Sequence, residues 1–324
     1  MDTTKVIAGV PQSEQAMTFS ARWFLVAALA LAAGCGPTFD PPSLVATTRV
    51  LAARVTAGTE APSRATPAPG EAASVAWLVT GPTAPGTQGW AFALCQPALS
   101  GDLTCGSAPY AVYQGSAPQP VVALTMPDAG ALGTATSVLL YGRICDGADP
   151  TFEPQSGLPA CTGGAAGTTA AVTIGVAGAG TVNHNPAAER GLTFDGQPWP
   201  APEPGADPCL AGPVITAGTK AHLIDLATAG SDRESYTLDF GDPPVVTPER
   251  EALQVSPFAT KGKFQNAFAF VDATEASDAP VADLKWDAPE AKDIHAATPV
   301  SFTFVVRDDR GGADWTTRAA CVTP

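Results

Sequence analysis

The chain of 324 residues carries 31 acidic and 17 basic side chains, and its formal net charge at pH 7 is −14. Such a surface repels nucleic-acid phosphates and anionic lipid head groups, which argues against a nucleic-acid-binding protein. Its 32 glycines and 32 prolines argue against long helices, and its length is enough for two domains that each bury a core.

The first distinctive element is the apolar run from Trp23 to Gly34. It is too short to span a bilayer, which needs about 20 residues. It follows Arg22 and ends in small residues, as the central segment of an export signal does. Residues 1–34 are therefore expected to be a signal peptide. Met17 is an alternative start, because the residues before it are polar.

The residues Leu31-Ala32-Ala33-Gly34-Cys35 end this run. They resemble the lipobox of bacterial lipoproteins, which implies lipidation of Cys35 after cleavage and a tether over residues 35–47. Two or more acyl chains hold a protein stably at a membrane. Gly36 is not aspartate, which in that family implies passage to the outer membrane. The alternative is an ordinary secretory signal with an incidental cysteine.

Short runs rich in β-forming residues follow, and Gly, Pro, Ser and Asp clusters separate them. They predict a first domain over residues 48–180. Residues 57–73 form either a long connection between the first two strands or a mobile loop, and we favour the connection. The expected strands are Arg49 to Val55, Ser74 to Thr80, Trp90 to Cys95, Val121 to Met126, Ser137 to Cys145 and Ala170 to Val176.

The second half shows clean alternation of apolar and polar residues. From Val300 to Val306 every second residue is apolar, which predicts a half-buried strand. Such strands without helical periodicity predict two antiparallel sheets packed face to face, in a domain over residues 181–324. The same alternation is found at Tyr236, Leu238 and Phe240, at Phe264, Phe268 and Phe270, and at Leu253 and Val255.

The segment Trp286 to Val322 contains Trp-x-Ala-Pro, a strand ending in Val-x-Asp, a Gly-Gly turn and a last strand. It resembles the end of a bacterial immunoglobulin-like or PKD-type module, and the pieces at Asn183 and Pro213 resemble its opening. With the lipobox, the chain is similar to envelope lipoproteins of Gram-negative bacteria that carry tandem modules of this type. The resemblance implies an all-β chain with two antiparallel β-sandwich, immunoglobulin-like domains.

Six cysteines remain beside Cys35: Cys95, Cys105, Cys145, Cys161, Cys209 and Cys321. An even number in an exported protein predicts disulfides. Proximity in the sequence favours the pairs Cys95 with Cys105, Cys145 with Cys161, and Cys209 with Cys321. The chain has no Cys-x-x-Cys, and His184, His222 and His295 are scattered, so no structural zinc site is expected.

Trp199 is the tryptophan of a proline-rich segment, "GQPWPAPEPG". It is a candidate ligand contact as an exposed aromatic platform, although packing against the prolines is the favoured alternative. A second candidate is a calcium site, for which turn capping is the favoured alternative. Its residues would be Asp308, Asp309 and Asp314, with Asp239 and Asp242.

Sequence motifs of catalysis are missing. Asp239-Phe240-Gly241 lacks the other kinase motifs, no Gly-x-Ser-x-Gly is present, and the histidines lack suitable neighbours. We therefore expect no enzyme, no cofactor and no metal, but a membrane-anchored cell-envelope lipoprotein acting as a non-catalytic adhesion, assembly or structural module. Its partner would be an envelope protein or a polysaccharide. A polysaccharide-binding module and then a secreted hydrolase are the alternatives. An exposed aromatic row would favour the polysaccharide-binding module, and a deep cleft with two carboxylates would favour the hydrolase.

Overall fold

The computed structural model describes residues 40–98, 103–165, 167–178, 182–188, 190–203, 205–240 and 245–324, and side chains are described outside 238–246. The predicted signal peptide and residues 35–39 of the predicted tether, Cys35 among them, lie outside the described residues. Contacts within the chain group Pro41–Pro324 into one unit.

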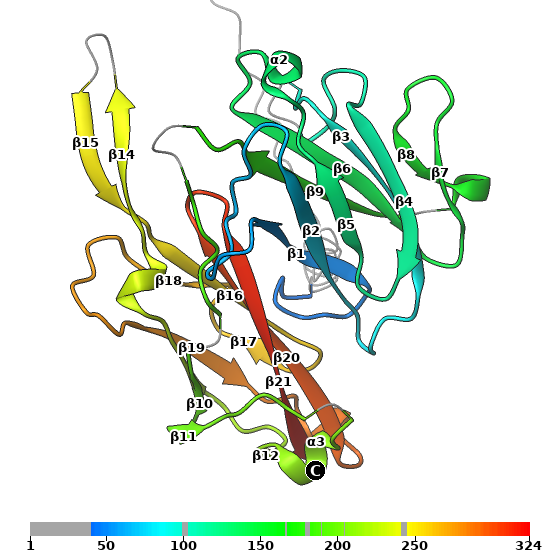
Figure 1. Ribbon diagram of the computed structural model, residues 1–324. Coiled ribbons are helices and arrows are strands. Elements are labelled where there is room, and N and C mark those ends of the chain that lie inside the picture. The colour runs from blue at the N-terminus through cyan, green and yellow to red at the C-terminus, as the bar shows by residue number, and fades with distance from the viewer. Residues whose placement is uncertain are drawn as a thin grey trace, which may run out of the picture. The chain divides into compact units, whose positions relative to one another are not determined.

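Strands dominate this unit, as predicted, so the protein is all-β (Figure 1). Its α-helices are single turns, α2 (Ala129–Leu132) and α3 (Pro208–Ala211). The 3-10 turns are η1 (Thr162–Gly164), η2 (Gly230–Asp232) and η3 (Ala291–Asp293). Within the described part of the chain, no helix has the length and hydropathy to cross a membrane.

The first half contains two larger sheets and a short hairpin, all antiparallel. Both larger sheets contribute side chains to one apolar core, in which Trp77 stacks on Phe92 with 4.9 Å between ring centroids. The sheets are β1 (Arg49–Ala57), β2 (Ala72–Thr80) and β5 (Val121–Thr125); β4 (Ala111–Ala117), β3 (Gln88–Cys95), β6 (Ser137–Cys145) and β9 (Thr168–Gly175); and β7 (Pro150–Phe152) with β8 (Pro159–Cys161).

The six strands predicted in this half are all present within a few residues of their expected bounds. Residues 57–73 connect β1 to β2, as favoured. The sequence did not predict β4, β7 and β8. In β4 no residue is fully buried, so its sequence lacks the apolar face that marks a strand.

The second half is built from two five-stranded sheets and the hairpin of β14 (Ser235–Phe240) with β15 (Val245–Arg250). Both sheets contribute to one core that contains Trp286, Phe302 and Phe304. The short β12 runs parallel to β21, and the other pairs are antiparallel. The first sheet is β11 (Gln197–Pro198), β10 (Leu192–Phe194), β13 (His222–Ala227), β19 (Val281–Asp287) and β17 (Lys263–Phe264), and the second is β12 (Val214–Thr216), β21 (Ala313–Thr323), β20 (Thr298–Asp308), β16 (Leu253–Ala259) and β18 (Ala269–Val271).

The predicted inward face of β20 is confirmed, because Val300, Phe302 and Phe304 are fully buried. The alternation read from Phe264 to Phe270 is wrong. Phe264 is buried in β17, whereas Phe268 and Phe270 are 48% and 58% exposed. The chain leaves β17 after Phe264 and enters β18 in a different sheet, so the three phenylalanines share no face.

Strand β21 buries a charged side chain. Its buried residues are Ala313, Thr316, Arg318, Ala320, Cys321 and Val322, whereas Thr317 is exposed. The Arg318 guanidinium is satisfied inside, because its Nε donates to the Trp199 carbonyl oxygen at 2.7 Å. A long charged side chain can therefore face a core when the backbone supplies its acceptors.

Buried polar side chains join the two halves of the unit. Asn185 Nδ2 donates to the Val55 carbonyl oxygen at 2.7 Å, and Asn185 Oδ1 accepts from the Ala313 amide at 3.0 Å. Arg54 forms an ion pair with Asp314 and lies over the Trp315 ring at 4.9 Å. Trp315 is partly buried and packs at this junction.

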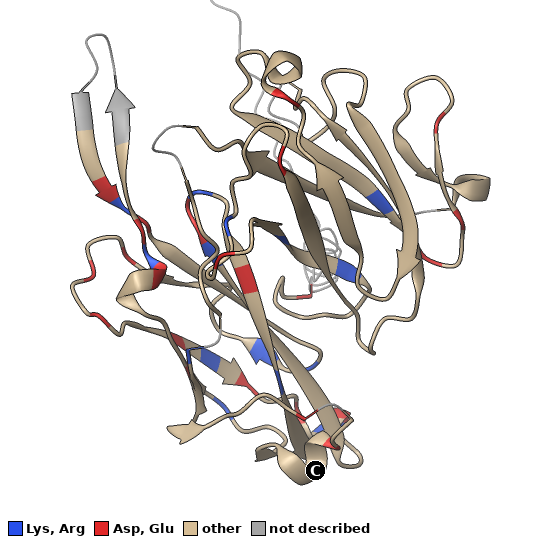
Figure 2. Ribbon diagram, in the orientation of Figure 1, with Lys and Arg blue, Asp and Glu red and all other residues tan. Residues whose placement is uncertain are grey.

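Charged residues are sparse on the strands of the first half and more frequent on the second (Figure 2). Glu251, between β15 and β16, is a carboxylic side chain that is fully buried. Its carboxyl group accepts from the Glu234 amide at 2.8 Å and from Arg310 Nη1 at 3.1 Å. Burial raises the pKa of Glu251 to about 7, and the nearby carboxylates of Asp308 and Glu234 add to the rise.

We expect this group to make stability depend on pH. Its pKa in the folded protein lies above the ordinary value of 4.5, so the folded state holds the proton more tightly. Its contribution is fully present below pH 4.5 and is lost as the pH rises through about 7, at a cost of up to about 3 kcal/mol. Urea unfolding of wild type and of Glu251→Gln between pH 4.5 and 8 should show this decline in wild type alone.

Glu275→Gln at an exposed position is the matched control, and it should keep the wild-type pH profile. Equal pH profiles for wild type and Glu251→Gln would show that Glu251 does not titrate in this range.

Candidate functional site

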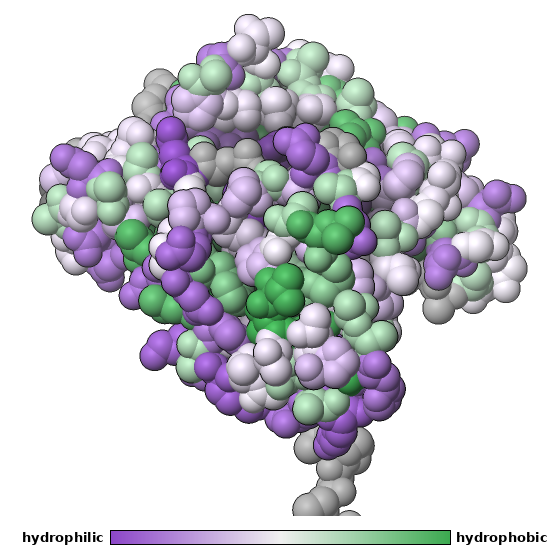
Figure 3. Space-filling view, turned by 90° about the horizontal axis from the view of Figure 1, so that it is seen from below, coloured by the Kyte–Doolittle hydropathy of each residue, from purple (hydrophilic) through white to green (hydrophobic). Residues whose placement is uncertain are grey.

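A cavity of about 830 Å³ lies at the end of the second half. Its lining includes residues of β11 and β12, each of which is an edge strand of one of the two sheets. Its volume is in the range of small-molecule sites, which are mostly apolar with a few polar groups. Figure 3 views the face on which α3 and β12 lie, and shows apolar patches among hydrophilic residues. The prolines of its lining are Pro198, Pro200, Pro202, Pro208 and Pro213.

The segment from Trp199 to Pro213 covers this cavity between the two edge strands. It contains α3, whose N-cap residue Asp207 accepts from the Cys209 amide at 2.9 Å. A disulfide between Cys209 and Cys321 ties α3 to β21. A Cβ atom on Gly212 would lie 2.6 Å from the Ala319 carbonyl oxygen, so only glycine permits this close approach.

The disulfide pairing predicted from the sequence is confirmed in full. The pairs are Cys95 with Cys105, Cys145 with Cys161, and Cys209 with Cys321. Each pair joins cysteines that are neighbours in the chain, counted without Cys35.

Trp199 borders the cavity but is no exposed platform, so that expectation is wrong. The side chain is 3% exposed, and its Nε1 donates to the Ala319 carbonyl oxygen at 3.0 Å. Its ring meets Phe194 and Phe302 edge to face, with centroids 5.1 Å apart in both pairs. Packing, the favoured alternative, is therefore right, although the rings it meets are core phenylalanines.

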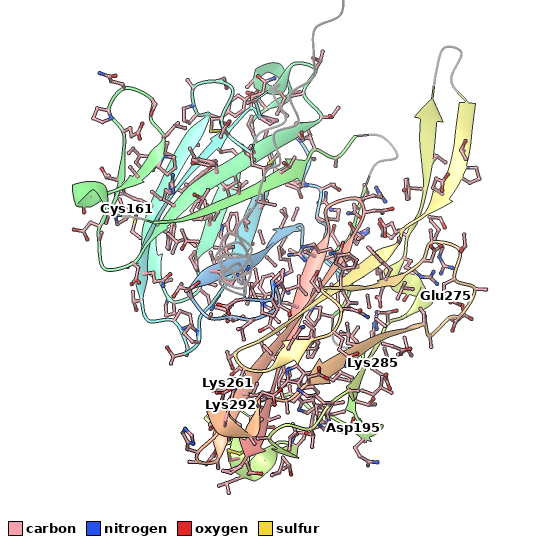
Figure 4. All side chains as sticks on the ribbon, turned by 180° about the vertical axis from the view of Figure 1, so that it is seen from behind. Cys161, Asp195, Lys261, Glu275, Lys285 and Lys292 are labelled. Carbon is pink, nitrogen blue, oxygen red and sulfur yellow. A yellow bond between two sulfur atoms is a disulfide. The ribbon has the colours of Figure 1, made fainter. Side chains whose placement is uncertain are left out.

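Three polar side chains form a hydrogen-bonded chain on the cavity wall. Asp195 Oδ2 lies 2.8 Å from His222 Nδ1, and His222 Nε2 lies 2.7 Å from Thr219 Oγ1. They come from the turn between β10 and β11, the start of β13, and the turn after β12. Figure 4 labels Asp195 and shows it at the end of the second half.

The position of the Asp195 carboxylate is fixed by its turn. Asp195 and Gly196 form the two-residue hairpin turn between β10 and β11, with φ of 50° and 76°. Positive φ at both central residues is characteristic of a type I′ turn, for which Asp-Gly is a preferred sequence. Asp195 Oδ1 accepts from the Leu223 amide at 2.9 Å, which leaves Oδ2 for His222.

The His222 ring is held by aromatic neighbours. It stacks on Phe194 with centroids 5.2 Å apart and lies 5.9 Å from Trp286. About 16% of its side chain is exposed, compared with 49% for Asp195. His222 is therefore oriented on both sides and still meets the solvent of the cavity.

The electrostatics of the cavity wall are one-sided. Asp195 and Glu203 are its acidic residues, and the described lining residues include no Lys or Arg. This arrangement disfavours anionic ligands and accepts neutral or cationic ones.

Two of the aspartates considered for calcium, Asp308 and Asp314, are bonded to groups of the protein itself. Asp308 Oδ1 accepts from the Arg310 and Gly312 amides at 2.8 Å each, which caps the turn as the favoured alternative expected. Asp314 pairs with Arg54. The side chain of Asp239 and all of Asp242 lie outside the described residues. In the described ranges no group of three His, Cys, Asp or Glu side chains has the arrangement of a metal site.

Comparisons with known proteins give no family for this chain. No family model matches the sequence, and no curated protein matches it. Among solved structures, it is similar to a crystal structure of red sea bream transglutaminase at 5% identity and a TM-score of 0.23. That alignment covers 85% of this chain and 31% of the transglutaminase chain.

Proposed function

We propose that this chain is a lipid-anchored protein of the cell envelope, held at the outer membrane through Cys35. In this proposal it performs adhesion, assembly or structural work by binding a partner and needs no catalysis for that role. The support for the anchor is the lipobox-like sequence from Leu31 to Cys35, which lies before the described residues. Three disulfides fit an export route, because they form in oxidising compartments.

In the same proposal the unit consists of two β-sandwich modules, of which the second is immunoglobulin-like. The support is that each half has its own apolar core, to which two sheets contribute. The polar contacts of Asn185 and Arg54 then fix one module against the other.

The observation that carries the binding role is the cavity beneath the disulfide-tied segment. Its rim continues into exposed apolar side chains, because Leu210 is 87% and Val214 is 64% exposed. An apolar surface of this kind marks interaction sites on soluble domains. The proposed partner is an envelope protein that inserts an uncharged or cationic apolar segment there.

A polysaccharide ligand is the second candidate. The observation that favours it is the exposed pair Phe268 and Phe270 beside the edge strand β18, with centroids 5.0 Å apart. Sugar rings pack their apolar faces on exposed aromatic side chains. Two phenylalanines form a smaller platform than the aromatic row that would favour this candidate more strongly.

The binding role is tested in intact cells with a photo-crosslinking amino acid at Val214. We expect one discrete crosslinked product, because Val214 borders the cavity and is exposed. The same amino acid at Val112, which is 50% exposed on β4, is the matched control and should give no such product.

The substitution Ala201→Trp should abolish the product by filling the cavity, because Ala201 lines it and is exposed. Equal crosslinking from Val214 and Val112, or a product that persists with Ala201→Trp, would contradict binding at the cavity.

A further inference from the structure

We infer that Thr219, His222 and Asp195 form a nucleophile, a general base and a positioning carboxylate that hydrolyse uncharged carboxylic esters bound in the cavity. This activity goes beyond the proposed binding role, which does not require it. The inference begins from geometry, because no sequence motif links the three residues.

The two hydrogen bonds have the lengths that nucleophilic catalysis needs. The base and the nucleophile are 2.7 Å apart, and the base and its carboxylate are 2.8 Å apart. Such a chain is defined by its geometry and roles, and it recurs on unrelated folds in different chain orders. All three residues line the same cavity, and Thr219 is exposed to it.

The base is prepared for proton transfer before any substrate binds. In the tautomer with its proton on Nδ1, His222 donates to Asp195 Oδ2, and its Nε2 presents a lone pair to Thr219 Oγ1. Stacking on Phe194 and the Leu223 amide bond to Asp195 prevent either partner from turning away.

The backbone around the site is held in uncommon conformations. Among the described residues, the non-glycine residues with positive φ are Asp195 at 50° and Ala221 at 58°. The hairpin turn accounts for Asp195, but Ala221 lies between the nucleophile and the base with its amide donating to Asp287 Oδ1 at 2.8 Å. Such residues cluster at functional sites, where they fix side chains in position.

The Thr219 hydroxyl has one proton and two neighbours. It lies 2.6 Å from the Thr216 carbonyl oxygen as well as 2.7 Å from His222 Nε2. With the proton on the Thr216 side, Thr219 only stabilises its turn. Rotation of the O–H toward Nε2 gives the reactive arrangement.

The cavity defines the substrate class. Prolines and the edge of Trp199 offer an apolar wall for an acyl chain, and Asp195 with Glu203 repels anionic groups. A neutral ester with a short acyl chain fits these constraints.

The reaction then balances with water as the second reactant. Thr219 Oγ1 bonds to the ester carbonyl carbon while its proton moves to His222 Nε2, and the ester C–O bond breaks as that proton passes to the leaving alkoxide. Water next attacks the acyl-threonine and gives one proton to Nε2. The carboxylic acid leaves, and the proton returns to Thr219 Oγ1.

Hydrolysis of 4-nitrophenyl butyrate by the full-length protein tests the inference. We expect Thr219→Val and His222→Gln each to lower the rate by about 100-fold or more, which is the usual contribution of such groups. Thr298→Val is the matched control with an unchanged rate, because Thr298 Oγ1 also donates to a carbonyl oxygen, at 2.8 Å, but lies outside the cavity lining.

A readout that a structural role would not move is covalent labelling by a fluorophosphonate, followed by peptide mass spectrometry. The label should be on Thr219 in wild type. The inference would be overturned if Thr219→Val hydrolysed the ester as fast as wild type. A label on a residue other than Thr219 would overturn it as well. Crosslinking from Val214 in Thr219→Val reports on the binding role separately, since that role needs no hydroxyl at residue 219.

Discussion

Replacing both Cys209 and Cys321 with alanine is expected to lower the free energy of unfolding by up to about 4.8 kcal/mol, by the loop-entropy relation. The bridge closes a separation of 112 residues, which is the largest of the three loops. It also fixes α3 on β21, so its loss frees the segment that covers the cavity. Thermal unfolding under oxidising conditions measures the effect as a lower Tm.

The matched control is the double alanine variant of Cys95 and Cys105, whose separation is 10 residues. The same relation gives about 2.7 kcal/mol for it. A reductant should affect wild type more than either variant. A smaller loss for the Cys209 and Cys321 variant than for the control, or a peptide map with either cysteine free, would contradict this account.

Trp199→Ala is expected to cost about 3–5 kcal/mol of unfolding free energy, which is the usual cost of deleting a buried tryptophan. The ring is 3% exposed and contacts Phe194, Phe302 and Phe304. Urea unfolding gives the value directly.

Trp199→Phe separates ring packing from hydrogen bonding. It keeps most of the apolar area and loses the bond to the Ala319 carbonyl oxygen. The loss of that bond should lower the free energy of unfolding by about 1 kcal/mol. A cost below about 1 kcal/mol for Trp199→Ala would mean that the side chain is not packed in the core.

The sequence predicted features that depend on neighbours along the chain. Alternation identified β20, because one buried face imposes a period of two on a strand. Two of the disulfide pairs followed from short spacing, and the bond from Cys145 to Cys161 closes the loop that contains the hairpin of β7 with β8.

Features that depend on long-range contacts were missed or misread. Arg318 is buried because the Trp199 carbonyl oxygen, far away in the chain, accepts from it. Trp199 packs on β20 and β21, whereas the favoured interpretation was packing against its neighbouring prolines. Local sequence contains neither partner, so no periodicity could reveal these contacts.

The cavity residues were missed for the same reason. His222 was noted only as one of three scattered histidines, and Asp195 and Thr219 carry no motif. The Asp-Gly pair at Asp195 is a hairpin signal that could have placed β10 and β11. Bringing its carboxylate to His222 requires the pairing of β10 with β13, which only the folded chain supplies.

The mass of the N-terminal peptide of the mature protein shows whether the protein is anchored through a lipid on Cys35. Protein from the membrane fraction should begin at Cys35 and carry the mass of a diacylglyceryl group with a further acyl chain. Cys35→Ser should be exported and leave that fraction, because a protein without acyl chains has nothing to bury in the bilayer. An unmodified Cys35, or a Cys35→Ser protein that remains as firmly membrane-bound as wild type, would contradict the account.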